Sequence, residues 1–228
     1  MTPPLCLLDF DGVIFDSAQE VYTICQEMAA SGLVSRTDVE IAEFMNFRKL
    51  VKDAWQFSYL YNKPNDPLPG NPEIDDEEFA HAFFKTRADL AKDSEWFNKI
   101  PAYPFFKRIK KHMLNHPNAF KIISTRNEDS ILKILHANDV NEIDVLGQAS
   151  IKKSGGKIQA ANMAGLLGRK QFTLYIDDML EYSNQFSSYV DFAMHASWGY
   201  GCPSEKSLSE TSAAALIDAL FMDFNNEI

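Results

Sequence analysis

The residues Leu7 to Ser17, LLDFDGVIFDS, join a short apolar run to a group of acids. The apolar run extends from Pro4 to Asp9, and its continuity is typical of a strand that is buried on both faces of a parallel sheet. Asp9 and Asp11 project to the same side of an extended chain, and Gly12 lets the chain turn sharply after them. Open α/β sheets bind ligands at the carboxyl ends of their strands, so this pair of acids indicates a site there.

Similar apolar runs and helical patterns alternate through the rest of the chain. The further runs are Ala119–Ser124, Ile143–Gly147, Phe172–Asp177 and Phe192–Ser197. The helical patterns are Glu128–Asn138, Lys157–Leu167, the stretch after Asp178, and Ser209–Phe224, for which Ser209 is the expected N-cap. Strands that alternate with helices imply βαβ units, and we predict an α/β fold with a doubly wound parallel sheet.

The segment from residue 17 to residue 100 interrupts this alternation. It has no strand pattern, and its amphipathic stretches Glu20–Ala30, Asp38–Tyr61 and Glu77–Phe97 indicate helices. Between the last two lies the turn-rich stretch Asn62–Pro72. We therefore predict a core domain of residues 1–16 and 101–228, with a helical domain of residues 17–100 inserted after the first strand.

Composition and charge exclude several classes of partner. The net charge of −10 gives no overall attraction for a polyanion, which argues against nucleic acid and anionic membranes as partners. The three cysteines lack C-x-x-C spacing, which argues against a disulfide framework or structural zinc and favours a reducing compartment. The first apolar run is cut by Asp9 and Asp11, unlike a signal peptide, and no run of ~18 apolar residues predicts a membrane span. We expect a cytoplasmic protein, either a monomer or a homodimer.

Two further strand ends carry side chains with chemical potential. Ser124 and Thr125 follow one apolar run, where a hydroxyl beside helix N-terminal amides can hold a phosphate oxygen. A helix N-cap is the commoner role for such a residue. Asp177 and Asp178 close another run, and adjacent acids there need a cation or hydrogen-bond donors to offset their repulsion. Alternatively, they stabilise the first turn of the next helix.

A lysine cluster, Lys152, Lys153 and Lys157, lies near the start of a predicted helix. A lysine there could neutralise both a phosphate and a nucleophile, although most lysines are solvated surface residues. A calcium loop is the alternative for the Asp-x-Asp-Gly string, but such a loop needs further oxygen ligands and a downstream Glu. Taken singly, each of these signals has an alternative explanation. The prediction of a functional site therefore rests on their order along the chain, from Asp-x-Asp through Ser and Lys to Asp-Asp.

This order resembles that of the haloacid dehalogenase superfamily of phosphohydrolases. The matching strings are DFDGVIFDS, IISTRN, a lysine near SGGK, and YIDD, and SWGYG (Ser197–Gly201) is similar to a segment of phosphoglycolate-phosphatase-like members. The resemblance implies a Rossmann-like core and makes the helical insert a C1-type cap domain.

The resemblance also implies a role for each matching residue. Asp9 would be the nucleophile and Asp11 the general acid and base. Ser124 and Thr125 would bind the phosphoryl group together with one lysine, and the choice between Lys153 and Lys157 stays open. Mg²⁺ would be held by Asp9, by Asp11 through its backbone carbonyl, and by Asp177 and Asp178. Arg48 lies where a cap arginine contacts substrate in sugar-phosphate members, with a surface ion pair as the alternative.

These assignments predict a Mg²⁺-dependent phosphatase that cleaves a monoester of a small phosphorylated metabolite. A carboxylate nucleophile splits hydrolysis into two easier steps through an aspartyl-phosphate, provided that positive charge screens the incoming phosphate. Asp11 argues against the dehalogenase branch, which lacks this second acid. The alternatives are a phosphomutase acting on a sugar phosphate, and a non-catalytic phosphoacceptor or binding protein.

Overall fold

The computed structural model describes residues 2–63, 76–93, 95–205 and 207–226. The chain divides into two compact units. The core unit consists of residues 1–16 and 101–228, and the helical unit consists of residues 17–100.

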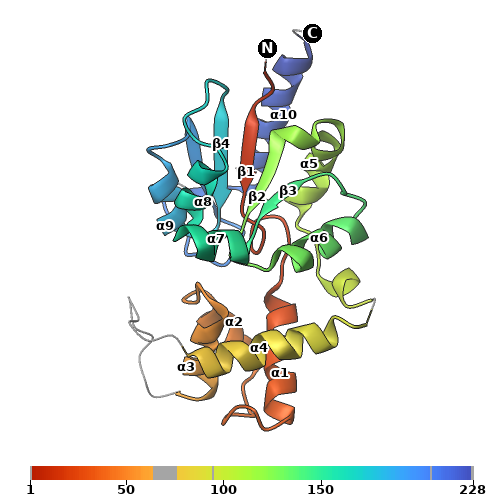
Figure 1. Ribbon diagram of the computed structural model, residues 1–228, viewed down its shortest axis with the longest axis vertical. Coiled ribbons are helices and arrows are strands. Elements are labelled where there is room, and N and C mark those ends of the chain that lie inside the picture. The colour runs from red at the N-terminus through yellow and green to blue at the C-terminus, as the bar shows by residue number, and fades with distance from the viewer. Residues whose placement is uncertain (1, 64–75, 94, 206, 227–228) are drawn as a thin grey trace. The chain divides into compact units, whose positions relative to one another are not determined.

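The core unit is built on a six-stranded sheet in which every neighbouring pair of strands is parallel. The strand order is β3-β2-β1-β4-β5-β6, and Figure 1 labels the first four of these strands. The strands are β1 Leu5–Leu8, β2 Phe120–Ile123, β3 Asp144–Leu146, β4 Thr173–Asp177, β5 Phe192–Ala196 and β6 Ser207–Leu208. The predicted α/β fold with a doubly wound parallel sheet is confirmed. The two-residue strand β6 was not predicted, because it is too short to leave an apolar run.

Helices connect strands of the core unit, except for the last helix, which follows the final strand β6. They are α5 Pro104–Asn115, α6 Glu128–Ala137, α7 Gln148–Ser154, α8 Lys157–Met163, α9 Leu180–Phe186 and α10 Glu210–Asn226, with a short 3₁₀ turn, η3, at Pro117–Ala119. Ser209 accepts a hydrogen bond from the backbone N–H of Ser212 at 3.2 Å, which bears out its expected capping role. Helix α8 ends earlier than expected, since Gly165 adopts a φ of +65° just beyond it.

The two faces of the sheet are covered by different helices. On one face, Leu5, Leu7 and Tyr175 form a buried cluster with residues of α7, α8 and α9. On the other face, Phe120 of β2 stacks on Phe221 of α10 with ring centroids 5.3 Å apart, and α5 packs against α10. Successive side chains of each strand point to opposite faces, so a continuous apolar run satisfies both layers.

The helical unit consists of short helices around an aromatic core. Its elements are α1 Ala18–Ala30, α2 Ile41–Arg48, η1 Ala54–Phe57, α3 Ser58–Tyr61, α4 Glu77–Leu90 and η2 Phe97–Lys99. The expected helix Asp38–Tyr61 is divided between Arg48 and Ala54, where Gln56 Oε1 accepts from the backbone N–H groups of Lys52 and Asp53. Phe44 and Phe57 stack at 5.0 Å across this division. Of the expected turn-rich stretch 62–72, residues 64–72 lie outside the described residues.

Within the described part of the chain, no helix is both long enough and apolar enough to span a bilayer.

Candidate active site

Three carboxylates meet where two central strands of the core unit end. Asp9 directly follows β1, Asp177 is the last residue of β4, and Asp178 comes next. Each offers a carboxylate oxygen within 4.8 Å of the other two, and all three side chains are buried. The chain runs from β1 to β2 and β3 on one side, and β4 returns to the other side of β1. The acids therefore lie at the topological switch point, where open α/β sheets bind ligands.

Gly12 lets the loop after β1 pass close to Asp178. Its φ is +84°, and a Cβ atom on it would lie 2.3 Å from Asp178 Oδ2. That oxygen accepts a hydrogen bond from the backbone N–H of Tyr200 at 2.8 Å. Glycine is required at residue 12 for both reasons, the left-handed backbone and the lack of space.

Lys157 supplies the positive charge of the cluster. Its Nζ lies 2.7 Å from Asp177 Oδ2 and 3.1 Å from Asp9 Oδ2, and the residue is only 3% exposed. It also lies over the ring of Tyr182, 4.4 Å from the centroid. Lys153, the other candidate, is exposed on α7. The geometry therefore places Lys157, and not Lys153, among the acids.

The carboxylate of Asp177 is saturated by donors from the protein. Its Oδ1 accepts from the backbone N–H of Met179 at 2.7 Å. Its Oδ2 accepts from Lys157 and from the hydroxyl of Tyr175, the latter at 2.5 Å. Asp177 thus anchors the lysine, whereas Asp9 and Asp178 are the better placed of the three to face a ligand.

The positive charge of Lys157 does not fully offset the burial of the Asp9 carboxylate and the negative charges around it. Burial is the main cause that raises the pKa of Asp9, Lys157 opposes it, and the nearby Asp177 and Asp178 add to the rise, which brings the pKa to about 8. Asp9 Oδ1 is buried and has no hydrogen-bond partner within the described residues. An unpaired buried carboxylate oxygen is costly, and a bound cation would remove that cost.

The loop after β2 carries the predicted hydroxyls. Ser124 is buried, and its Oγ accepts from the backbone N–H of Arg126 at 3.3 Å, whereas Thr125 is half-buried. Ser124 is not the N-cap of α6, because Asn127 fills that role by accepting from Ser130 N at 3.3 Å. The hydroxyl of Ser124 thus lies in the loop at the end of β2, next to the loop that follows β1.

Asp11 is not part of the carboxylate cluster formed by the described residues. Its Oδ1 lies 3.0 Å from Arg126 Nη1. The expectation that Asp11 holds a metal through its backbone carbonyl stays a prediction. Arg126 and Tyr175 were not singled out from the sequence. Tyr175 had a usable signal, since it lies two residues before Asp177 on a strand and must face the same side.

Arg48, the predicted substrate contact, is the last residue of α2 in the helical unit. Its Nη1 donates to the backbone carbonyl of Val51 at 2.9 Å. Its contact with a substrate stays a prediction.

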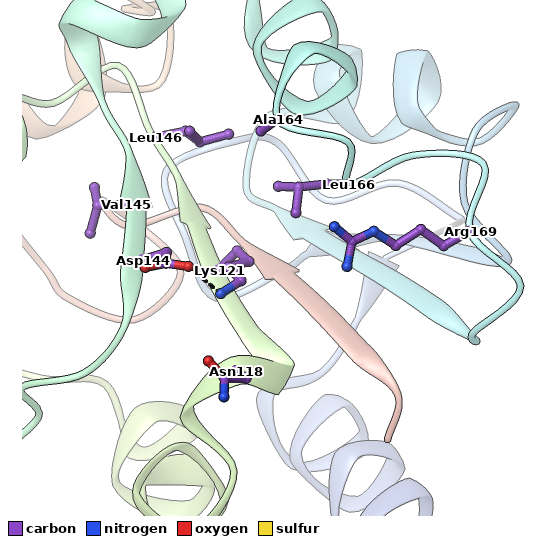
Figure 2. Close-up of a pocket in the computed structure, with 8 residues that line it drawn as sticks. All are labelled: Asn118, Lys121, Asp144, Val145, Leu146, Ala164, Leu166 and Arg169. Carbon is purple, nitrogen blue, oxygen red and sulfur yellow. Dashed lines mark hydrogen bonds and ion pairs between the residues drawn. The ribbon is translucent and has the colours of Figure 1, made fainter. Parts of the chain in front are cut away.

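A cavity of about 530 Å³ lies on the core unit beside β2 and β3, and none of the three clustered acids lines it. Figure 2 shows the ion pair between Lys121 and Asp144 on one side of this cavity and Arg169 on the other. The remaining lining residues are Asn118, Val145, Leu146, Ala164 and Leu166.

Solved structures with the same fold cover nearly the whole chain. A predicted phosphatase from Clostridium acetobutylicum is 13% identical, with a TM-score of 0.64 over 97% of this chain and 100% of its own. A haloacid dehalogenase-like family hydrolase from Streptococcus pneumoniae is 12% identical, with a TM-score of 0.64 over 94% and 98%. A predicted phosphoglycolate phosphatase from Haemophilus somnus is 15% identical, with a TM-score of 0.59 over 88% of both chains.

No protein-family model and no curated protein matches the sequence. At these low identities the structural matches establish the fold, and they agree with the family that the motifs indicated. The chain has the fold of the haloacid dehalogenase-like hydrolases.

Proposed function

We propose that this protein is a Mg²⁺-dependent phosphatase that hydrolyses a small-molecule phosphate monoester through an aspartyl-phosphate on Asp9. The observation that carries the proposal is the buried meeting of Asp9, Asp178 and the Lys157–Asp177 pair at the ends of β1 and β4. Structural neighbours named as phosphatases support the same reaction class.

The residues fit a magnesium ion. Carboxylate oxygens are the ligands that Mg²⁺ prefers, and Asp9 Oδ1 has no other partner within the described residues. Asp9 and Asp178 would hold the ion, and Asp177, whose carboxylate already accepts from protein donors, would contribute negative charge nearby. When bound, Mg²⁺ would supply positive charge that screens the phosphate from the carboxylates.

The protein's own groups account for the remaining steps. The Asp9 carboxylate attacks phosphorus, the bond to the ester oxygen breaks, and Asp11 gives a proton to the departing alcohol. Asp11 then takes a proton from the water that attacks the aspartyl-phosphate, which releases phosphate and restores Asp9. Lys157 neutralises charge beside the nucleophile, and Ser124 with Thr125 binds the phosphoryl oxygens. The helical unit is proposed to act as a cap domain, in which Arg48 contributes to substrate choice.

The test is release of inorganic phosphate from a panel of small phosphorylated metabolites, assayed with Mg²⁺ and then with a chelator. We expect activity only with the metal. Asp9→Asn should lower kcat by about a thousandfold or more, because the neutral amide cannot form the phosphoenzyme. Asp129→Asn, a matched change at an exposed residue of α6, should leave kcat unchanged.

Turnover retained by Asp9→Asn would refute the nucleophile assignment. Conversion of a sugar phosphate to its isomer without release of phosphate would replace the phosphatase with a phosphomutase.

A further inference from the structure

Arg126 is a buried cation that the proposed reaction does not yet use. Its side chain is only 1% exposed, and its Nη1 lies 3.0 Å from Asp11 Oδ1. Burying a guanidinium is costly unless a carboxylate and further hydrogen bonds compensate for the lost water. The ion pair with Asp11 therefore fixes the position of the Arg126 side chain.

Further contacts fix the orientation of the guanidinium. Its Nε donates to Ser130 Oγ at 2.9 Å, and its Cζ lies 5.7 Å from the ring centroid of Phe10. The backbone is held as well, since the N–H of Arg126 donates to Ser124 Oγ and its carbonyl accepts from Gln148 N at 2.8 Å. The arginine is thus a rigid part of the loop after β2.

Asp11 is the more accessible partner of the pair. Its side chain is 21% exposed, against 1% for Arg126, and it lies in the loop just beyond Asp9. An ion pair with a rigid partner restricts the side-chain torsion angles of such a carboxylate. Loss of that orientation would matter, because proton transfer to a leaving group requires the donor within hydrogen-bond reach.

We propose that Arg126 is a positioning residue that orients the carboxylate of Asp11 toward the oxygen of the leaving group. This proposal rests on the proposed function, in which Asp11 transfers the proton. It adds an element that connects the loops after β1 and β2 and that the transfer of the phosphoryl group to Asp9 needs only when the leaving group needs a proton.

Dependence on the leaving group tests this role. p-Nitrophenolate leaves without a proton, whereas an alkoxide does not, so the first step, phosphoryl transfer to Asp9, needs a well-placed Asp11 only with alkyl esters. Arg126→Met should lower kcat/KM for an alkyl phosphate about tenfold or more and that for p-nitrophenyl phosphate by less than about threefold. Both values report the steps up to phosphoryl transfer. Equal losses with both esters would show a structural role alone and overturn the proposal.

A double-mutant cycle gives an independent readout. If Arg126 acts through Asp11, then Arg126→Met should cause no further loss with the alkyl ester once Asp11→Ala is present. A loss in that background as large as in the wild type would contradict the proposal.

Milder variants cover the case in which Arg126→Met does not fold. Arg126→Lys keeps the charge but not the forked geometry of the guanidinium, and it should retain part of the wild-type activity on the alkyl ester. Ser130→Ala removes the contact at Nε and should give the same selective loss at smaller size. Arg108→Met removes an arginine that pairs with Asp218 on another helix, and it should leave kcat/KM unchanged for both the alkyl ester and p-nitrophenyl phosphate. Selective loss in none of the milder variants would also overturn the proposal.

The outcomes separate this inference from the proposed function. A wild-type protein that cleaves neither ester with Mg²⁺ overturns the proposed function and this inference together. A wild-type protein that cleaves both, with variants that lose activity equally on both, overturns this inference alone.

Discussion

Lys157 is a buried cation whose charge is maintained by its neighbours. Burial acts to lower the pKa of Lys157, but the carboxylates of Asp177 and Asp9 outweigh it, so that the pKa lies above its ordinary value. Tyr175 belongs to the same group. Burial, and then the charge of Asp177, raises the pKa of its hydroxyl well above the usual value. The hydroxyl therefore stays protonated and donates to Asp177, which holds the lysine in turn.

We predict that Tyr175→Phe weakens both the fold and the activity. The variant removes one donor from the buried Asp177 and should lower the free energy of unfolding by about 1–2 kcal/mol. Because Asp177 is then held less firmly, Lys157 is less well placed beside Asp9, and kcat should fall severalfold. Urea unfolding and steady-state kinetics measure the two effects.

Tyr189→Phe is the matched control, because Tyr189 is exposed, and it should change neither quantity. Wild-type kcat and stability in Tyr175→Phe would show that the hydroxyl contributes nothing to the cluster.

At the scale of elements, α5 and α10 are joined by a group of charges as well as by apolar packing. Asp218 of α10 lies 2.8 Å from Arg108 Nε, 3.1 Å from Lys111 Nζ and 2.8 Å from His112 Nε2, all on α5. Burial acts to raise the pKa of Asp218, but hydrogen bonds from His112, Lys111 and Arg108 outweigh it and lower the pKa to about 2. The carboxylate therefore connects the two helices across most of the pH range.

This connection predicts a pH-dependent effect of Asp218→Asn. A carboxyl group whose pKa is lowered by folding stabilises the fold above its unfolded pKa and loses that contribution as the pH falls through the folded value. At pH 7 the variant should be less stable by about 1 kcal/mol, since two of the partners are partly exposed. The difference should shrink between about pH 4 and pH 2. Urea unfolding of both proteins across this range is the measurement.

Asp139→Asn changes an exposed acid that pairs with Lys110 and should have little effect at any pH. A deficit in Asp218→Asn that is the same at pH 7 and at low pH would mean that packing, and not charge, causes it.

The elements that the sequence predicted best are those with a strong local pattern. The five predicted strands agree with β1 to β5 within a residue or two. The signal was strongest for β1 and β4, which are buried along their whole length, because a strand buried on both faces needs continuous apolar residues. Helix α5 was not predicted, although Pro104 at its start and apolar residues at 105, 106, 109 and 113 provide the signal.

Contacts between the side chains of distant segments could be predicted only in part. Asp9, Asp177 and Asp178 could be predicted to converge, because strand ends in a parallel sheet share an edge. Two lysines of one cluster could not be distinguished, since the choice depends on which one faces the sheet when α8 begins. The pairing of Arg126 with Asp11 also depends on the placement of two loops far apart in the chain.

At the scale of the whole molecule, the central strand β1 pairs with strands that come much later in the sequence. Cys6 pairs with Phe120 of β2, and Leu5 pairs with Thr173 of β4. During synthesis from the N-terminus, this apolar strand emerges long before either neighbour exists. Contacts of such long sequence separation form slowly and leave strand edges exposed meanwhile.

We therefore expect that residues 5–8 of the nascent chain need protection from aggregation until residue 177 has left the ribosome. In refolding, the amide protons of Leu5 and Asp9, which donate to the carbonyls of Phe172 and Ile176, should gain protection from exchange no earlier than those of Leu174 to Ile176. Pulsed hydrogen exchange measures this order, and early protection of the first strand would contradict it. Because Asp9 directly follows β1, whereas Asp177 and Asp178 lie at the end of β4, the carboxylate cluster can form only after residue 178 has been made.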